Sequence, residues 1–316
     1  MTMEYLKPKR IKPGDTIGII SPSSGLWQRS ELWRSIEQFE KWGYKVKVGE
    51  HAYKNNYYLA GTDEERASDL MRFFRDDSVD AIICSQGGYG ASRLLDLIDY
   101  EVIRKNPKIF MGYSDITALH LAIYKHSGLL TFHGPSATSA GTEYMTEFRE
   151  KYMFRALTGA DPIGIIEPTD YLVKINPGIV TAPIIGGNLT LIVSTLGTPY
   201  EIDTKGKILF FEELDTEPWV IDHMMTHLKN AGKFNDAVGF LIGDSHTCEP
   251  FKMNPGFPNQ MSMEDVIFDI LAPYKKPILM GLEIGHTKNL ATLPMGILAK
   301  LDTINGVFEI LETATV

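Results

Sequence analysis

The stretch Lys108-Ile-Phe-Met-Gly-Tyr-Ser-Asp-Ile-Thr-Ala-Leu-His120 joins a short apolar run, a sharp turn and a helical pattern. Residues 109–111 are typical of a buried strand, Gly112 permits the turn, and residues 115–125 follow with a helical pattern. The hydroxyl of Ser114 is therefore expected outside the backbone turn, at a helix N-terminus where unpaired N–H groups and the macrodipole favour negative charge. This is the arrangement of a nucleophile elbow.

The local pattern leaves two interpretations of Ser114 open. The general elbow signature is Gly-x-Ser-x-Gly, and it fails here because the last position is Ile116. Alternatively, Ser114 or Asp115 simply caps the helix that follows.

Composition and charge narrow the class of protein. The chain has 316 residues, 44% hydrophobic and 22% charged, which suits a globular protein of two domains or one large one. Its net charge of −9 argues against nucleic-acid binding, because phosphate contacts need clustered Lys and Arg. Residues 1–15 contain no apolar signal-peptide core, and no apolar run reaches membrane-spanning length. We expect a soluble cytoplasmic protein with no membrane partner, and we expect Cys84 to be a core residue rather than half of a disulfide.

The first half of the chain alternates strand and helix patterns. Strands are expected at 16–20, 45–48, 81–84 and 109–111, and helices at 31–42, 62–75, 92–98 and after Ser114. This alternation predicts an α/β fold with a parallel, doubly wound sheet. Ligands of such sheets bind beyond the carboxyl ends of the strands, where the residues after 84 and 111 should converge.

The second half predicts a smaller, β-rich α+β domain. Strands are expected at 207–211, 237–242, 277–282 and 297–310, and helices at 218–231 and 263–271. A linker is expected near 158–170. We therefore expect an N-terminal domain over 1–165 and a C-terminal domain over 175–316.

A serine nucleophile needs a base, and the base needs an orienting acid. His286 follows the apolar run 277–282 in a loop leaving a strand, which makes it the preferred base among eight histidines, although an ordinary surface histidine remains possible. Glu212 and Glu213 end the apolar strand 207–211. Glu212 is the better candidate for the acid, and Glu213 is the alternative.

The glycine-rich stretch Gln86-Gly-Gly-Tyr-Gly90 follows a predicted strand. It lacks the Lys-Ser/Thr of a P-loop and does not match Gly-x-Gly-x-x-Gly, so a nucleotide site is weakly supported. Adjacent glycines let backbone N–H groups approach a ligand closely, and one of them with the Asp115 N–H suits an oxyanion hole.

Metal binding is a competing interpretation. His223 and His227 share a helix face, but the sequence His-Met-Met-Thr-His lacks the glutamate of a His-Glu-x-x-His site. A polar loop also brings together potential ligands, namely Asp244, His246, Cys248 and Glu249. Loop polarity is the simpler explanation of that group, so we expect neither a metal nor another cofactor.

Together these motifs resemble the LD-carboxypeptidases, a family of serine peptidases. The resemblance rests on Gly112-Tyr-Ser-Asp-Ile-Thr117, Gly87-Gly-Tyr-Gly-Ala-Ser-Arg93, Ile208-Leu-Phe-Phe-Glu212, and Gly285-His286 with Leu293-Pro-Met-Gly296. These motifs run in the family's order over nearly the whole chain.

The resemblance implies a catalytic triad and a fold. Ser114 would be the nucleophile, His286 the base and Glu212 the orienting acid, with the N–H groups of Gly88 and Asp115 as the oxyanion hole. The fold would be a Rossmann-like N-terminal domain joined to a β-rich C-terminal domain, with the triad spanning the two. A homodimer without metal or cofactor would be expected.

The resemblance also implies a reaction, the removal of terminal D-alanine from murein tetrapeptides in cytoplasmic cell-wall recycling. A related branch resembles microcin C immunity hydrolases, which cleave peptidyl-nucleotides, and a non-catalytic murein-peptide binding protein is a further alternative. Many carboxypeptidase members carry Arg before the Gly-Gly pair, where this chain has Gln86. Gln86, Gly87 and Arg93 are candidate substrate contacts, and residues 134–142 are a candidate lid.

Overall fold

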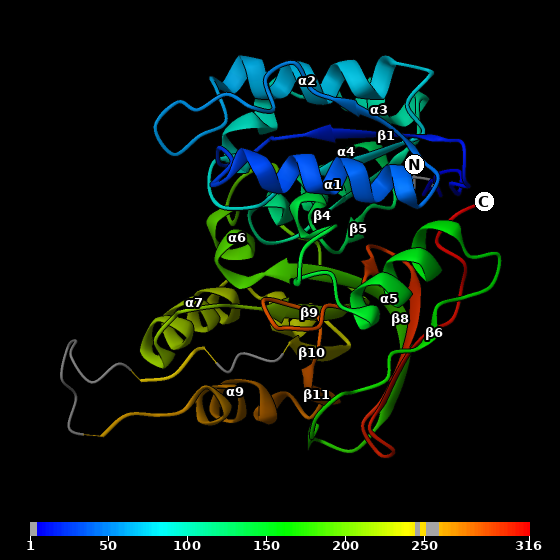
Figure 1. The fold of residues 1–316 in the computed structure, drawn as a ribbon. Helices are drawn as coiled ribbons and strands as arrows, with labels where there is room; N and C mark the ends of the chain where they lie inside the picture. The colour runs from blue at the N-terminus through cyan, green and yellow to red at the C-terminus, as the bar shows by residue number, and fades with distance from the viewer. Residues whose placement is uncertain (1–4, 244–246, 251–258) are drawn as a thin grey trace.

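The first half of the chain folds around a largely parallel sheet (Figure 1). The computed structural model describes residues 5–243, 247–250 and 259–316. In sheet order the strands are β12 (Leu293–Pro294), β5 (Phe132–His133), β4 (Ile109–Gly112), β3 (Ala81–Cys84), β1 (Thr16–Ile20) and β2 (Lys45–Val48). All neighbours pair in parallel except β12 with β5. The predicted doubly wound sheet is confirmed, and the carboxyl ends of β1 and β3 flank the point where the strand order reverses.

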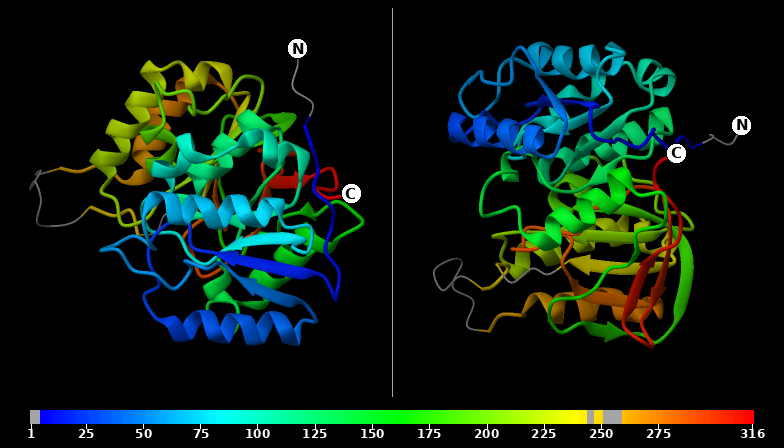
Figure 2. Two further views of the ribbon diagram at one scale, coloured as in Figure 1. Left: turned by 90° about the horizontal axis from the view of Figure 1, so that it is seen from above. Right: turned by 45° about the vertical axis from the view of Figure 1, so that its right-hand side comes forward.

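Helices cover both faces of this sheet, with α1 on one side and α2 and α3 on the other (Figures 1 and 2). They are α1 (Arg29–Lys41), α2 (Asp63–Arg75), α3 (Tyr100–Lys105), α4 (Thr117–Ser127) and α5 (Glu147–Thr158), with the 3₁₀ turns η1 (Ala91–Leu97), η2 (Ser114–Ile116) and η3 (Ala137–Ser139). Alternate strand residues face opposite layers. Ile19 packs in the same buried cluster as Leu32 of α1, whereas Ile20 packs with Leu70 of α2.

The second sheet combines parallel and antiparallel pairs. Its order is β6 (Gly164–Ile165), β14 (Val307–Ile310), β13 (Leu298–Asp302), β8 (Ile179–Asn188), β9 (Ile208–Glu212), β10 (Gly239–Gly243), β11 (Ile278–Leu282) and β7 (Val173–Ile175). Its helices are α6 (Leu189–Ser194), α7 (Pro218–Asn230), α8 (Lys233–Asp236) and α9 (Met263–Leu271), with the 3₁₀ turn η4 (Ala272–Tyr274). The predicted mixed α/β architecture with a second sheet is confirmed.

Several predicted elements differ in detail. The helix expected at 92–98 is the 3₁₀ turn η1, and the N–H of its first residue, Ala91, donates to the Asp115 carboxylate (2.7 Å). The strand expected at 297–310 is the hairpin β13–β14, because Asp302 accepts two backbone N–H bonds and fixes a turn. Strand β6 lies inside the segment expected as a linker.

Two crossing segments hold the sheets together. The end of β8 abuts α4, where the Asn188 N–H donates to Thr117 Oγ1 (3.0 Å). The segment containing β12 pairs with β5 and continues into the second sheet, where the Gly296 N–H donates to the Ile184 carbonyl (2.7 Å). The site between the sheets therefore depends on these contacts.

The two ends of the described chain also pair. Arg10 N–H donates to the Val316 carbonyl, and Val316 N–H donates to the Pro8 carbonyl, both at 3.0 Å. Within the part of the chain that the structure describes, no helix is both long and apolar enough to cross a bilayer.

Gly187→Ala should loosen the junction between the sheets. Gly187 has φ +139°, and an added Cβ would lie 2.5 Å from the Thr117 side chain. We expect a loss of unfolding free energy above about 3 kcal/mol, from strain and overpacking together, measured by denaturant unfolding. Gly197→Ala is the matched control, because Gly197 also has a positive φ (+76°) but open space around its Cβ, and should cost about 1–2 kcal/mol. Equal losses would show that the contact with Thr117 is unimportant.

Candidate active site

Ser114 occupies a strained turn shortly after β4, a strand in the middle of the first sheet. Its φ is +64°, a left-handed conformation that is uncommon for a residue with a side chain. A Cβ on Gly87 would lie 2.8 Å from the Ser114 Cβ, so only glycine fits on the neighbouring loop. Neither Ser114 nor Asp115 caps α4 or η2 with its side chain, so the capping interpretation is wrong. The turn has the geometry of a nucleophile elbow.

The Asp115 side chain anchors this turn to two other loops. Its carboxylate accepts hydrogen bonds from Ser23 Oγ (2.5 Å) and from the Ala91 N–H (2.7 Å), and the residue is 2% exposed. Burial raises the pKa of Asp115, and the two hydrogen bonds oppose that rise. The loops after β1, β3 and β4 are thus tied together at the carboxyl edge of the sheet.

Glu212 and His286 form a hydrogen-bonded pair that comes from the second sheet. Glu212 is the last residue of β9 and is completely buried, and its Oε2 accepts a 2.6 Å bond from His286 Nδ1. Glycines make room for the carboxylate, since a Cβ at Gly285 or Gly243 would lie 2.6 or 2.8 Å from the Glu212 Cβ. With Nδ1 engaged, Nε2 of His286 remains the ring nitrogen available for proton transfer.

The pair has shifted pKa values with identifiable causes. Burial alone would lower the pKa of His286, but the charge and hydrogen bond of Glu212 outweigh it and raise that pKa. Burial likewise acts to raise the pKa of Glu212, but His286 reverses the effect and the carboxyl pKa is lowered. Both shifts favour a carboxylate beside a histidine that accepts protons readily.

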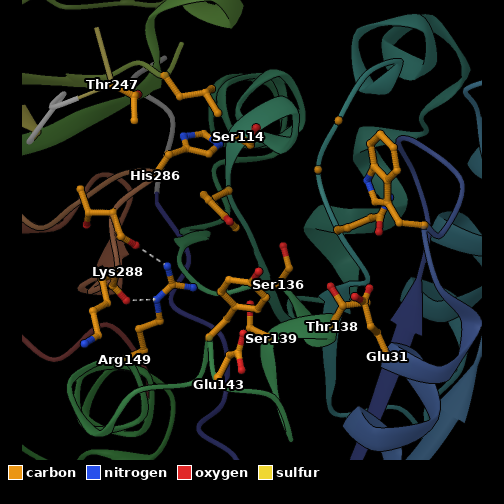
Figure 3. A pocket seen from close by; sticks show the side chains of 18 of the residues that line it. Glu31, Ser114, Ser136, Thr138, Ser139, Glu143, Arg149, Thr247, His286 and Lys288 are labelled. Carbon is orange, nitrogen blue, oxygen red and sulfur yellow. Dashed lines mark hydrogen bonds between the residues drawn. The ribbon is translucent and has the colours of Figure 1, made fainter. Parts of the chain in front are cut away.

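A cavity of about 970 Å³ lies where the two sheets meet, and both Ser114 and His286 line it (Figure 3). The ring of Tyr113, the residue before Ser114, lies 4.9 Å from the His286 ring between centroids. The structure thereby brings together the predicted nucleophile, base and acid. Ser114 Oγ has no hydrogen-bond partner among the described residues, and catalytic contacts are often looser without substrate.

Two backbone N–H groups beside Ser114 are free to stabilise negative charge. In the described part of the chain, neither the Gly88 nor the Asp115 N–H donates to another group. Gly88 has φ +112°, and a Cβ there would overlap Ser24 Oγ at 2.3 Å, so the loop requires glycine. Gly88 lines the cavity, as an oxyanion hole requires.

Of the three residues predicted to contact the substrate, two line the cavity and one does not. Gln86 and Gly87 line the cavity, but the Gln86 amide donates to the Gly25 carbonyl (2.8 Å). Arg93 is not among the cavity-lining residues and instead pairs with Asp63 (2.9 Å). The segment 134–142, expected as a lid, supplies a wall that is fastened to Ser85 through both the N–H and the hydroxyl of Thr138.

Two further residues that line the cavity, Arg149 and Tyr113, were not predicted from the sequence. Arg149 lies in the first turns of α5, lines the cavity and is 4% exposed. Its Nε donates to the Lys288 carbonyl (3.0 Å) and its Nη2 to the Thr287 carbonyl (2.5 Å), as the dashed lines in Figure 3 show. Nothing in the sequence near Arg149 indicated a place in the site, because the charged stretch around it is typical of an exposed helix face. Tyr113 could have been predicted, because it directly precedes Ser114.

The alternative metal ligands do not form a cluster among the described residues. His223 and His227 lie on α7, and the described residues contain no cluster of three or more potential ligands. Asp244 and His246 lie outside the described residues. Cys84 and Cys248 are both buried and free, so the expectation for Cys84 is confirmed.

Comparison with known proteins gives consistent matches over both halves of the chain. The LD-carboxypeptidase N-terminal domain matches residues 17–134 and the LD-carboxypeptidase C-terminal domain matches residues 181–301. The chain is 41% identical over 298 residues to the "Probable murein peptide carboxypeptidase" of Bacillus subtilis, covering 94% of this chain and 92% of that protein.

Two solved structures share the fold. The MccF-like protein from Bacillus anthracis has a TM-score of 0.87 and 30% identity, covering 96% of this chain and 99% of that one. The muramoyltetrapeptide carboxypeptidase from Oxalobacter formigenes has a TM-score of 0.77 and 27% identity, covering 93% and 97%.

Glu212→Gln should lower the pKa of His286. The amide removes the negative charge that outweighs burial, so the imidazole pKa should fall from above its usual value of about 6.5 to below it. NMR titration of ¹⁵N-labelled histidine measures this shift. Glu213→Gln is the matched control, because Glu213 bonds Asn188 and Thr190 rather than His286, and a larger shift there would transfer the acid's role to Glu213.

Proposed function

The chain belongs to the LD-carboxypeptidase family, and we propose from this premise that it removes the terminal D-alanine of murein tetrapeptides by serine catalysis. The observation that carries the proposal is that His286, hydrogen-bonded to the buried Glu212, lines the same cavity as the strained Ser114. This arrangement also argues against a role in binding alone, since binding needs neither a polarised base nor a strained serine.

The proposed reaction has two acyl-transfer steps. His286 Nε2 takes the Ser114 proton as Oγ bonds to the carbonyl carbon of the L-residue, and the oxygen gains the electron pair of the broken π bond. The N–H groups of Gly88 and Asp115 hold this oxyanion. Collapse breaks the C–N bond, and His286 gives its proton to the departing amine of D-alanine.

Water completes the cycle. His286 takes a proton from water as its oxygen attacks the acyl-enzyme, and Ser114 leaves with that proton as the shortened peptide is released. Glu212 stabilises the protonated imidazole in both steps through the 2.6 Å bond. The cycle uses only side chains and backbone groups of this chain, and the proposal includes no cofactor.

Location and assembly are part of the same proposal. We place the reaction in the cytoplasm, where unpaired cysteines such as the buried Cys84 and Cys248 persist without forming disulfides. The homodimer is proposed from the family resemblance.

A second candidate function is hydrolysis of a peptidyl-nucleotide. It is favoured by the fit to the MccF-like structure and by two exposed aromatic residues at the cavity, Trp27 (87% exposed) and Tyr144 (61%), which could stack on a base. The higher sequence identity to a murein peptide carboxypeptidase favours the first proposal. Hydrolysis of an aminoacyl-sulfamoyl adenosine, with no release of D-alanine from tetrapeptide, would decide for the second.

Ser114→Ala should abolish the release of D-alanine from a murein tetrapeptide. Loss of the nucleophile from a cooperating triad costs several orders of magnitude in kcat, on the order of 10⁴-fold or more. Mass spectrometry of the products measures release, and unfolding curves of the variant check that it folds. Near-normal turnover by this variant would refute the assignment of Ser114.

The activity should fall as the pH drops through the pKa of His286. The base must be neutral, and its pKa is raised, so the acidic limb of kcat/KM should lie above the value of about 6.5 typical of free histidine. Glu212→Gln should lower the rate and move this limb to lower pH. A limb that stays in place in that variant would show that Glu212 does not govern the base.

A further inference from the structure

Arg149 is a buried cation without an ionic partner. It is 4% exposed, and across the described residues no carboxylate forms an ion pair with it. Arginine is rarely buried unless it is paired, because removing its charge from water is costly. Burial correspondingly lowers the pKa of Arg149. An uncompensated guanidinium in the wall of a cavity suits an anionic ligand.

The guanidinium is held rigidly and keeps donors in reserve. Two of its five N–H groups are used by the carbonyls of Lys288 and Thr287, and the Tyr113 hydroxyl is a further neighbour. The N–H groups of Nη1 are not used by these two carbonyls. Carboxylates are the anions that such a fork of planar donors binds best.

Ser136 gives a second, independent sign of a missing ligand. Its side chain lines the same cavity, is 4% exposed, and its buried Oγ has no hydrogen-bond partner in the described structure. A buried hydroxyl without a partner is costly, so such a group indicates that something polar binds there. Figure 3 shows Ser136 and Arg149 among the side chains that line this cavity.

The position of Arg149 matches the leaving group of the proposed reaction. His286 must contact the departing amine to protonate it, and in an amino acid a single carbon separates amine from carboxylate. Arg149 binds the carbonyls of the two residues that directly follow His286. A cation fixed there acts electrostatically on His286, so it is suitably placed for a carboxylate that lies one carbon from the departing amine.

We propose that Arg149, with Ser136, binds the α-carboxylate of the C-terminal residue and restricts the enzyme to removing terminal residues. This rests on the proposed function and names the group that makes it a carboxypeptidase. Gln86 cannot take this role with equal strength, because it is neutral and its amide already donates to the Gly25 carbonyl. Glu143 also lines the cavity, but it is exposed and its charge remains solvated.

The test compares two tetrapeptides that differ only at the C-terminus, one ending in D-alanine and one in D-alaninamide. The wild type should prefer the free acid by about 30- to 100-fold in kcat/KM. Arg149→Met should lower kcat/KM for the acid by about 30- to 100-fold more than for the amide, so that the preference disappears. Arg149→Lys should retain part of it, and Ser136→Ala should reduce it by about 3- to 10-fold.

A merely structural role for Arg149 gives a different result. Loosening the His286 loop would slow both peptides equally and leave the acid-to-amide ratio unchanged, and that outcome would overturn the inference. Arg155→Met is the matched control, because Arg155 is exposed on the same helix and contacts the Ile163 carbonyl. Its ratio should equal that of the wild type.

The outcomes separate this inference from the proposed function. If the wild type cleaves both peptides at equal rates, the carboxylate site is refuted while the serine carboxypeptidase reaction stands, a result that does not depend on whether any variant folds. If the wild type cleaves neither peptide, with no release of D-alanine from the acid or of D-alaninamide from the amide, the proposed function fails, and the inference falls with it.

Discussion

The contact between the two sheets is the constraint on which the candidate site depends. Ser114 comes from the first sheet, whereas Glu212 and His286 come from the second, so a small rotation at the junction would separate Ser114 from the Glu212–His286 pair. The junction is built from backbone groups and close packing. His133, at the end of β5, bonds the Ile284 carbonyl (2.9 Å) two residues before His286, which ties the loop of His286 directly to the first sheet. Effective catalysis needs positioning at this level, since small misplacements of reacting groups are costly.

The electrostatics of the site follow from the burial of Glu212 and from the access of His286 to the cavity. Glu212 is sealed from water, and its Oε1 has no hydrogen-bond partner in the described structure, so His286 dominates its stabilisation. His286 faces the cavity and gains a proton most readily because of that buried charge. The cost of burying the carboxylate is thus coupled to the basicity of the imidazole, and neither side chain would keep its present pKa alone.

Local sequence patterns predicted the parts of the fold and site that depend on neighbours in the chain. The strand, turn and helix around Ser114 could be recognised because apolar periodicity and Gly112 lie within a few residues. The pairing of β12 with β5 could not, because a two-residue strand has no periodicity and its partner lies far away in the sequence. Arg149 was missed for the same reason: its partners are backbone carbonyls, which leave no trace in side-chain identity.

The backbone anchoring of Arg149 links recognition of the substrate's C-terminus to the loop of His286. A cation for the substrate can be supplied from any element that reaches the cavity wall, so Gln86 in place of arginine does not remove the charge from the site. Supplying it from α5 fastens the same guanidinium to the loop that carries His286. A substrate carboxylate bound there would compensate the buried charge and also stiffen the loop of His286, so binding of the correct terminus would improve the position of the His286 side chain. Binding energy of that kind is expressed in kcat as well as in KM.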